Sequence, residues 1–170
     1  MVVRRVLLCL VLLLLAVILE VTLLAPLPFP GATPPLVLVT VAALAFAFGP
    51  TTGAVCGFVG GLLLDVAPPA AGTLGIGALV LTVVGYALGR LGDPNDRPLV
   101  VSVGGTAAAG ALAVVAGAVL GGLLGNPRTQ WGEVPGLTIT AGLYAAFLAV
   151  LLVPLIQRLA RRLVPEAFSR

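Results

Sequence analysis

The sequence predicts an all-α membrane protein, a bundle of six transmembrane helices with both termini in the cytoplasm. Apolar residues make up 60% of the chain and charged residues only 9%, and the mean hydropathy is +1.22. Soluble domains carry about a quarter of their residues as charged side chains. The apolar residues form six segments, and the basic residues gather at alternate ends of these segments. We therefore treat residues 1–170 as a single integral membrane domain.

Breaks that contain proline, glycine or charged residues separate the six apolar segments. The predicted spans are residues 6–25, 35–48, 51–67, 73–89, 99–125 and 136–156.

The first segment has the length of a membrane helix, about 20 residues. Arg4 and Arg5 precede it, as basic residues precede the apolar part of a signal peptide. However, Pro26 and Pro28 directly follow Ala25, the only small residue suited to cleavage. We therefore predict a retained first helix.

The second and third segments form one nearly uncharged stretch that must fold back on itself. Residues 35–67 would extend to roughly 50 Å as one helix, whereas the hydrocarbon core of a bilayer is about 30 Å thick. Gly49 and Pro50 supply the break, and Thr51 or Thr52 is expected to cap the returning helix. The fifth segment is also long, so it either tilts or begins only after Gly104 and Gly105.

The distribution of arginine predicts the orientation. With a cytoplasmic N-terminus, only Arg128 falls in an outer loop. The arginines that fall on the inner side are Arg4, Arg5, Arg90, Arg97, Arg158, Arg161, Arg162 and Arg170. Basic residues favour the cytoplasmic side of a membrane, so the distribution agrees with an even number of spans. Because the arginines lie at segment ends and aromatic residues are few, we expect no nucleic-acid partner.

The residue types leave little room for catalysis. The chain has no histidine and no lysine, and its only serines are Ser102 and Ser169, so a nucleophile and base cannot be paired. Nothing in the spacing of acidic residues predicts a metal site or a cofactor site. Cys9 and Cys56 lie inside apolar segments and are interpreted as small buried hydrophobic residues. We predict that the protein is not an enzyme.

Two acidic residues lie near the predicted outer ends of their helices. We interpret Glu20 as an acid that reaches the outer lipid headgroups. Asp65 differs, because Gly53, Gly57, Gly61 and Asp65 recur every four residues along one face of the third helix. Small residues let membrane helices approach closely, so this stripe is expected to face another helix and to take Asp65 with it.

The seven-residue connection 66–72 returns the chain close to Asp65. We therefore expect the Asp65 carboxylate to accept hydrogen bonds from the N–H groups that follow Thr73, at the positive end of the fourth helix. Thr73 is a second candidate cap for that helix. The alternative is that Asp65 pairs with an arginine of a partner chain.

Residues 53–90, "GAVCGFVGGLLLDVAPPAAGTLGIGALVLTVVGYALGR", resemble the MreD family of the bacterial rod-shape system. The matching features are a glycine-rich helix that ends in G-L-L-x-D at Asp65, a loop with proline and glycine, Gly75 at the start of an apolar helix, and Gly85-Tyr86 near its end. The chain length, the six predicted spans and the basic C-terminus extend the similarity. The family commonly has Pro-Asp at the start of its second helix, where this chain has Pro34-Pro35, so no role of that acid is transferred.

The resemblance implies a non-enzymatic component of the cell-elongation complex in the bacterial cytoplasmic membrane, regulating cell shape and peptidoglycan synthesis. Its expected partner is an MreC-like periplasmic scaffold protein with a single span. Through this partner it would be linked to the glycosyltransferase RodA, its transpeptidase and the actin-like MreB. Membrane lipid would surround the protein and contact its outer surface.

The family also resembles, in fold, the six-helix substrate-binding subunits of energy-coupling-factor transporters. A small-molecule, vitamin-type binding subunit is therefore the alternative function. Such a pocket needs several convergent polar groups. The outer region here offers Glu20, Asp65, Arg128, Gln130, Trp131 and Glu133.

Overall fold

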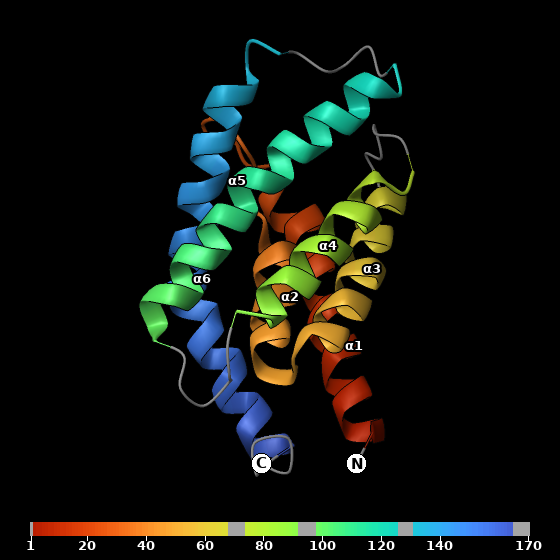
Figure 1. Cartoon of the computed structure of the whole chain (residues 1–170), viewed down its shortest axis with the longest axis vertical. Helices are drawn as coiled ribbons and strands as arrows, with labels where there is room; N and C mark the ends of the chain where they lie inside the picture. Colours follow the sequence, from red (N-terminus) through yellow and green to blue (C-terminus); the bar gives the residue numbers. More distant parts are fainter. Residues whose placement is uncertain (1, 68–73, 92–97, 126–130, 165–170) are drawn as a thin grey trace.

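The residues that the structure describes form six α-helices that pack as one bundle (Figure 1). The computed structural model describes residues 2–67, 74–91, 98–125 and 131–164. The helices are α1 (Val2–Leu19), which continues as the π-helical turn η1 (Glu20–Leu24), α2 (Leu36–Phe48), α3 (Pro50–Val66), α4 (Ile76–Gly89), α5 (Leu99–Leu123) and α6 (Val134–Leu163). Each predicted apolar segment thus forms a helix, and the all-α prediction is confirmed.

Three of these helices are long and apolar enough to cross a membrane: Val3–Leu24, Leu99–Leu123 and Val134–Leu163. The helices α2, α3 and α4 are apolar but shorter. At about 1.5 Å per residue, the 13 residues of α2 extend only about 20 Å, against a hydrocarbon core of about 30 Å. Length and composition therefore identify three candidate spans.

Helix α2 is the centre of the bundle. Every residue from Val37 to Ala47 is buried, and α2 contacts each of the other five α-helices. Figure 1 shows it, in orange, surrounded by the others. A helix that is apolar on all sides is expected inside a protein rather than at its surface. The core of the molecule therefore forms around α2.

The turn between α2 and α3 differs from the expected threonine cap. Gly49 occupies the N-cap position of α3 with φ +87°, a left-handed conformation that glycine adopts without strain, and Pro50 is the first helical residue. Proline suits this position because its fixed φ is already helical and no partner for an N–H is needed. The Thr52 hydroxyl donates instead to the Phe48 carbonyl, at 3.3 Å. The hairpin was predicted correctly, but its cap was not.

Helices α3 and α4 pack backbone against backbone along the glycine stripe. Gly53 lies against Gly85, Gly57 against Leu81, and Gly61 against Gly77. The partners descend by four residues as the stripe ascends by four, so the two helices run antiparallel in one fixed register. A Cβ atom added to Gly61 would lie 2.6 Å from the Cα atom of the neighbouring α4 residue, Ala78. This interface accepts no side chain.

Helix α5 runs unbroken through Gly104 and Gly105, so of the two expectations for this segment the late start is wrong. Figure 1 shows α5 inclined to the long axis of the bundle, as a helix of this length predicts. It packs on α6 through small residues: a Cβ atom on Gly110 would lie 2.8 Å from Cβ of Ala145. Close packing by small residues thus joins α5 to α6 as well.

We expect Gly57→Ala to lower the free energy of unfolding in detergent by about 1–3 kcal/mol, because the new methyl group would overlap the Leu81 carbonyl and force the helices apart. The matched control is Gly104→Ala, in an exposed helical position with no atom within 4 Å of the added Cβ. It should be neutral or stabilising by up to about 1 kcal/mol. Thermal unfolding of both variants tests the interface, and equal effects would contradict it.

Candidate functional site

The carboxylate of Asp65 caps the N-terminus of α4. Its Oδ2 atom accepts hydrogen bonds from the N–H groups of Gly75, at 2.8 Å, and Ala78, at 3.2 Å. Its Oδ1 atom accepts a third from Gly77, at 3.2 Å. Because α4 begins at Ile76, these donors include N–H groups that have no acceptor within the helix. A negative charge is also favourable at the positive end of a helix.

Gly75 explains why the acceptor must come from another helix. It occupies the N-cap position of α4, where Ser, Thr, Asp or Asn would usually supply a side-chain oxygen, but it has no side chain. Its φ of +97° lies in the left-handed region, which favours glycine. Asp65, at the end of α3, supplies the missing oxygen atoms. The second candidate cap, Thr73, lies outside the described residues.

Glu20 makes a similar contact with α2, which its interpretation as a headgroup acid did not include. Its Oε2 atom accepts a hydrogen bond from the Val37 N–H at 2.6 Å, in the first turn of α2. The N-cap residue there is Pro35, whose side chain has no oxygen to offer. The π-helical turn at the end of α1 carries Glu20 to this position. The half-buried Glu20 side chain therefore joins η1 to the start of α2.

The two acids lie at one end of the bundle, which we call the carboxylate end; the opposite end, where α1 begins and α6 ends, is the arginine end. The stripe of Gly53, Gly57 and Gly61 runs along α3 toward Asp65, and all four residues contact α4. The structure thus brings together Asp65, Gly75 and the glycine stripe, which were predicted as site residues. Glu20 lies apart from them and contacts the start of α2. Their contacts are structural ones.

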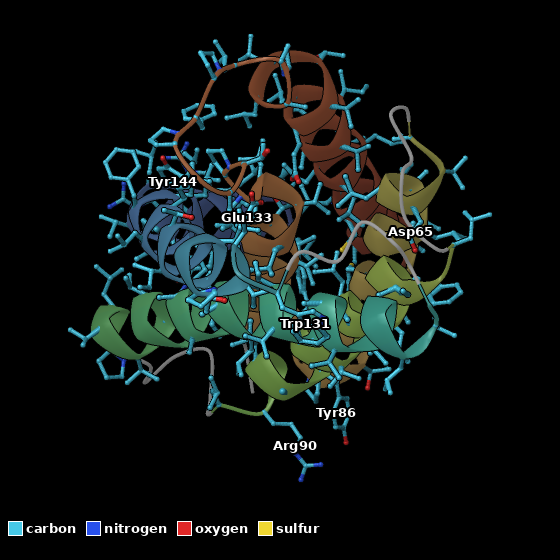
Figure 2. All side chains as sticks on the ribbon, turned by 90° about the horizontal axis from the view of Figure 1, so that it is seen from above. Asp65, Tyr86, Arg90, Trp131, Glu133 and Tyr144 are labelled. Carbon is cyan, nitrogen blue, oxygen red and sulfur yellow. The ribbon has the colours of Figure 1, made fainter. Side chains whose placement is uncertain are left out.

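The connection between α1 and α2 lies across α6 at the carboxylate end. The Ala32 N–H donates to Thr140 Oγ1 at 3.0 Å, and the Tyr144 hydroxyl donates to the Pro30 carbonyl at 3.3 Å. The rings of Phe29 and Tyr144 meet edge to face with centroids 5.8 Å apart. Figure 2, which views this end, shows Tyr144 beside the connection. The sequence gives no periodic signal for these contacts.

A cavity of about 250 Å³ lies between the helices at this end. Glu20 and Thr33 are its main polar lining groups, and the other walls come mostly from apolar residues of α2 to α6. Trp131 and Glu133, which were expected to enrich the outer region in polar groups, do not line it. Figure 2 shows both away from Asp65. Arg128 and Gln130 lie outside the described residues.

The potential metal-ligating side chains form no metal centre in the part of the chain that the structure describes. No three His, Cys, Asp or Glu side chains cluster within those ranges. Cys9 and Cys56 are buried, as expected, and belong to the same hydrophobic core cluster.

A second concave feature, the α4–α5 groove, has a volume of about 690 Å³ and only apolar walls. Residues between Leu79 and Leu88 of α4, with Leu91 just beyond that helix, form one wall, and residues between Gly105 and Leu120 of α5 form the other. The inclination of α5 leaves this groove open along the side of the bundle. None of the predicted site residues lines it.

Comparison with protein families, with curated proteins and with solved structures finds no match to this chain.

Asp65→Leu should lower the free energy of unfolding by about 1–3 kcal/mol, because it leaves the N–H groups of Gly75, Gly77 and Ala78 without their acceptor. Asp65→Asn keeps one acceptor oxygen and should cost clearly less. Thermal unfolding in detergent measures both.

The control for this comparison is Glu133→Leu, which removes an exposed acid at the N-cap of α6 that makes no side-chain capping bond. Its effect should stay within about 0.5 kcal/mol. If both Asp65 variants are as stable as the parent but lose a bound partner protein, Asp65 serves an interface and the capping role is wrong.

Proposed function

We propose that this chain is an MreD-like, non-enzymatic component of the bacterial cell-elongation complex, located in the cytoplasmic membrane, and that it acts by binding an MreC-like scaffold protein with a single span. The observation that supports this proposal most directly is the position of the residues that resemble the MreD family: they lie where α3 packs against α4. Gly53, Gly57, Gly61, Asp65 and Gly75 all hold α3 to α4. The motif thus builds a rigid hairpin, and the lateral surfaces remain for partners.

A six-span topology with cytoplasmic termini is part of this proposal. The start of α1 and the end of α6 lie at the same end of the bundle (Figure 1), which suits an even number of crossings. Arg5, Arg90 and Arg158 lie on helices that begin or end there, in agreement with a cytoplasmic arginine end. The short length of α2 is no obstacle, because protein rather than lipid surrounds it.

The α4–α5 groove supports binding of a partner helix. Its α4 wall from Leu79 to Leu88 extends about 14 Å and its α5 wall from Gly105 to Leu120 about 22 Å, the latter a large part of the hydrocarbon core. Small residues, among them Ala108, line the α5 wall and permit close approach of another helix. Such a helix satisfies its own backbone hydrogen bonds, so apolar walls suffice.

Through the scaffold protein, the chain would be linked indirectly to RodA, the partner transpeptidase and MreB. Its own contribution in this arrangement is positional: it would hold the scaffold's membrane helix in a defined place beside the bundle. This role requires no cofactor and no catalytic group.

The alternative is a vitamin-type binding subunit of a transporter, and the cavity at the carboxylate end is the observation in its favour. Its volume of about 250 Å³ lies below the range of roughly 300–1,000 Å³ typical of ligand pockets, and it has few polar groups. One of these, Glu20, is already bonded to α2. We therefore favour the scaffold-binding function.

Reporter fusions test the topology. A reporter after Arg170 or in the connection 90–98 should register as cytoplasmic, and one near Arg128 as external, because of the arginine asymmetry. An external C-terminus would require an odd number of spans and would overturn the six-span proposal.

Purification from native membranes in mild detergent should retain a single-span protein with a periplasmic domain, identified by mass spectrometry. Ala108→Trp, which fills the α4–α5 groove from an exposed position, should abolish this retention. Leu143→Trp, at an exposed site on α6 outside the groove, should preserve it. Purified protein that carries a tightly bound vitamin and no such partner would favour the transporter subunit instead.

A further inference from the structure

A third concave feature, the α1–α3 groove, opens at the arginine end and has a volume of about 630 Å³. Its α1 wall extends from Arg5 to Leu13, and its α3 wall extends from Pro50 to Val59. Polar groups lie at one end of it, and the rest of the lining is almost entirely apolar. This division resembles that of a lipid molecule, which has one polar end and a long apolar remainder.

The polar end consists of the guanidinium of Arg5 and the hydroxyls of Thr51 and Thr52. Arg5 is fixed in place, because its Nη2 donates to the Phe48 carbonyl at 3.1 Å and its Cζ lies 4.9 Å from the centre of the Phe48 ring. A guanidinium has five N–H donors, so this bond leaves others for a ligand. Among the described residues that line the groove, none is acidic. The positive charge therefore favours an anion, and guanidinium suits phosphate.

The apolar part is open toward the surroundings of the bundle. Val6, Leu10 and Val55 line it and expose 49%, 42% and 59% of their surface. Cys9 and Cys56 are buried residues of the same lining. An acyl chain can thus enter sideways from the bilayer and cover these exposed side chains.

The length of the α1–α3 groove favours a lipid rather than a partner helix as its occupant. From Arg5 to Leu13 the α1 wall extends about 12 Å, close to the depth of one leaflet, roughly half of the ~30 Å core. A spanning helix would extend well beyond this groove and would bring no anion to Arg5. The α4–α5 groove differs on both counts, since its α5 wall is longer, at about 22 Å, and it has no polar end.

We propose that the α1–α3 groove binds an anionic glycerophospholipid, with one acyl chain between α1 and α3 and the phosphate at Arg5 and Thr51. Under the topology proposed above, this lipid belongs to the cytoplasmic leaflet. The site does not depend on the scaffold protein and goes beyond that proposed function. The lipid would complete the packing of α1 against α3 where the protein alone leaves a gap.

Native mass spectrometry of the full chain in detergent, titrated with phosphatidylglycerol or phosphatidylcholine of the same acyl chains, tests this site. The chain should retain phosphatidylglycerol in preference to phosphatidylcholine. Arg5→Gln should weaken phosphatidylglycerol binding about fivefold, the effect of one basic side chain at an anionic lipid surface. Val55→Trp, which fills the groove, should abolish binding of both lipids at this site.

Two matched controls accompany these variants. Arg90→Gln removes another arginine that stacks on an aromatic ring, that of Tyr86, outside the groove, and Leu62→Trp enlarges an exposed residue of α3 that does not line it. Both should bind phosphatidylglycerol as the parent does. Because Arg5 also donates a hydrogen bond to Phe48, its replacement can destabilise the bundle. In that case Val55→Trp is the decisive variant, because Val55 is exposed and its replacement should not disturb folding.

Equal retention of the two lipids by the parent would mean that the groove holds only unselected bilayer lipid, and the proposal would be wrong. Unchanged phosphatidylglycerol binding in Val55→Trp would also overturn it. If Val55→Trp instead releases a bound membrane protein and leaves the lipid, the groove is a protein interface; the scaffold-binding function would then stand and the lipid site would not.

Discussion

The ends of the central helix impose the constraint on which the rest of the bundle depends. Helix α2 is buried along its length, so the free N–H and C=O groups at its two ends must find partners inside the protein. One partner at each end comes from α1 or its continuation η1: Glu20 accepts from Val37 at the start of α2, and Arg5 donates to Phe48 at its end, where Thr52 of α3 also donates. The acid meets the positive end of the helix dipole and the arginine meets the negative end. This pair fixes α1 antiparallel to α2 and sets its register.

A similar contact occurs between α3 and α4: the carboxylate of Asp65, at the end of α3, accepts hydrogen bonds from N–H groups at the start of α4. In both cases the cap position itself, Pro35 or Gly75, has no side-chain oxygen, so an acid of the preceding helix provides one. Backbone N–H groups offset part of the cost of placing each acid in an apolar setting. Three of the few charged side chains in the helices therefore hold the bundle together, and an interacting function must use the lateral surfaces that they leave.

The positions of the helices and the Asp65 contact could be predicted from the sequence, because each depends on neighbours along the chain. Apolar segments with Gly-Pro breaks locate the helices, and the short connection after Asp65 leaves it little choice of partner. Glu20 could not be placed in this way, since the connection to α2 is long and lies across α6 at Thr140. The expected threonine cap of α3 failed because Gly49 and Pro50 begin that helix without it. The grooves follow from the inclination and packing of whole helices, which no local pattern encodes.

The contrast between the two lateral grooves has a consequence for recognition. The α1–α3 groove carries a charge at one end, so an occupant can be selected by its electrostatics as well as its shape. The α4–α5 groove carries none, and a helix bound there gains no hydrophobic driving force from leaving lipid. Its selection must then rest on van der Waals contact, which Gly105 and Ala108 make possible by allowing close approach. A partner of this groove is therefore distinguished by the shape of its own helix face, and bulky residues on that face would exclude it.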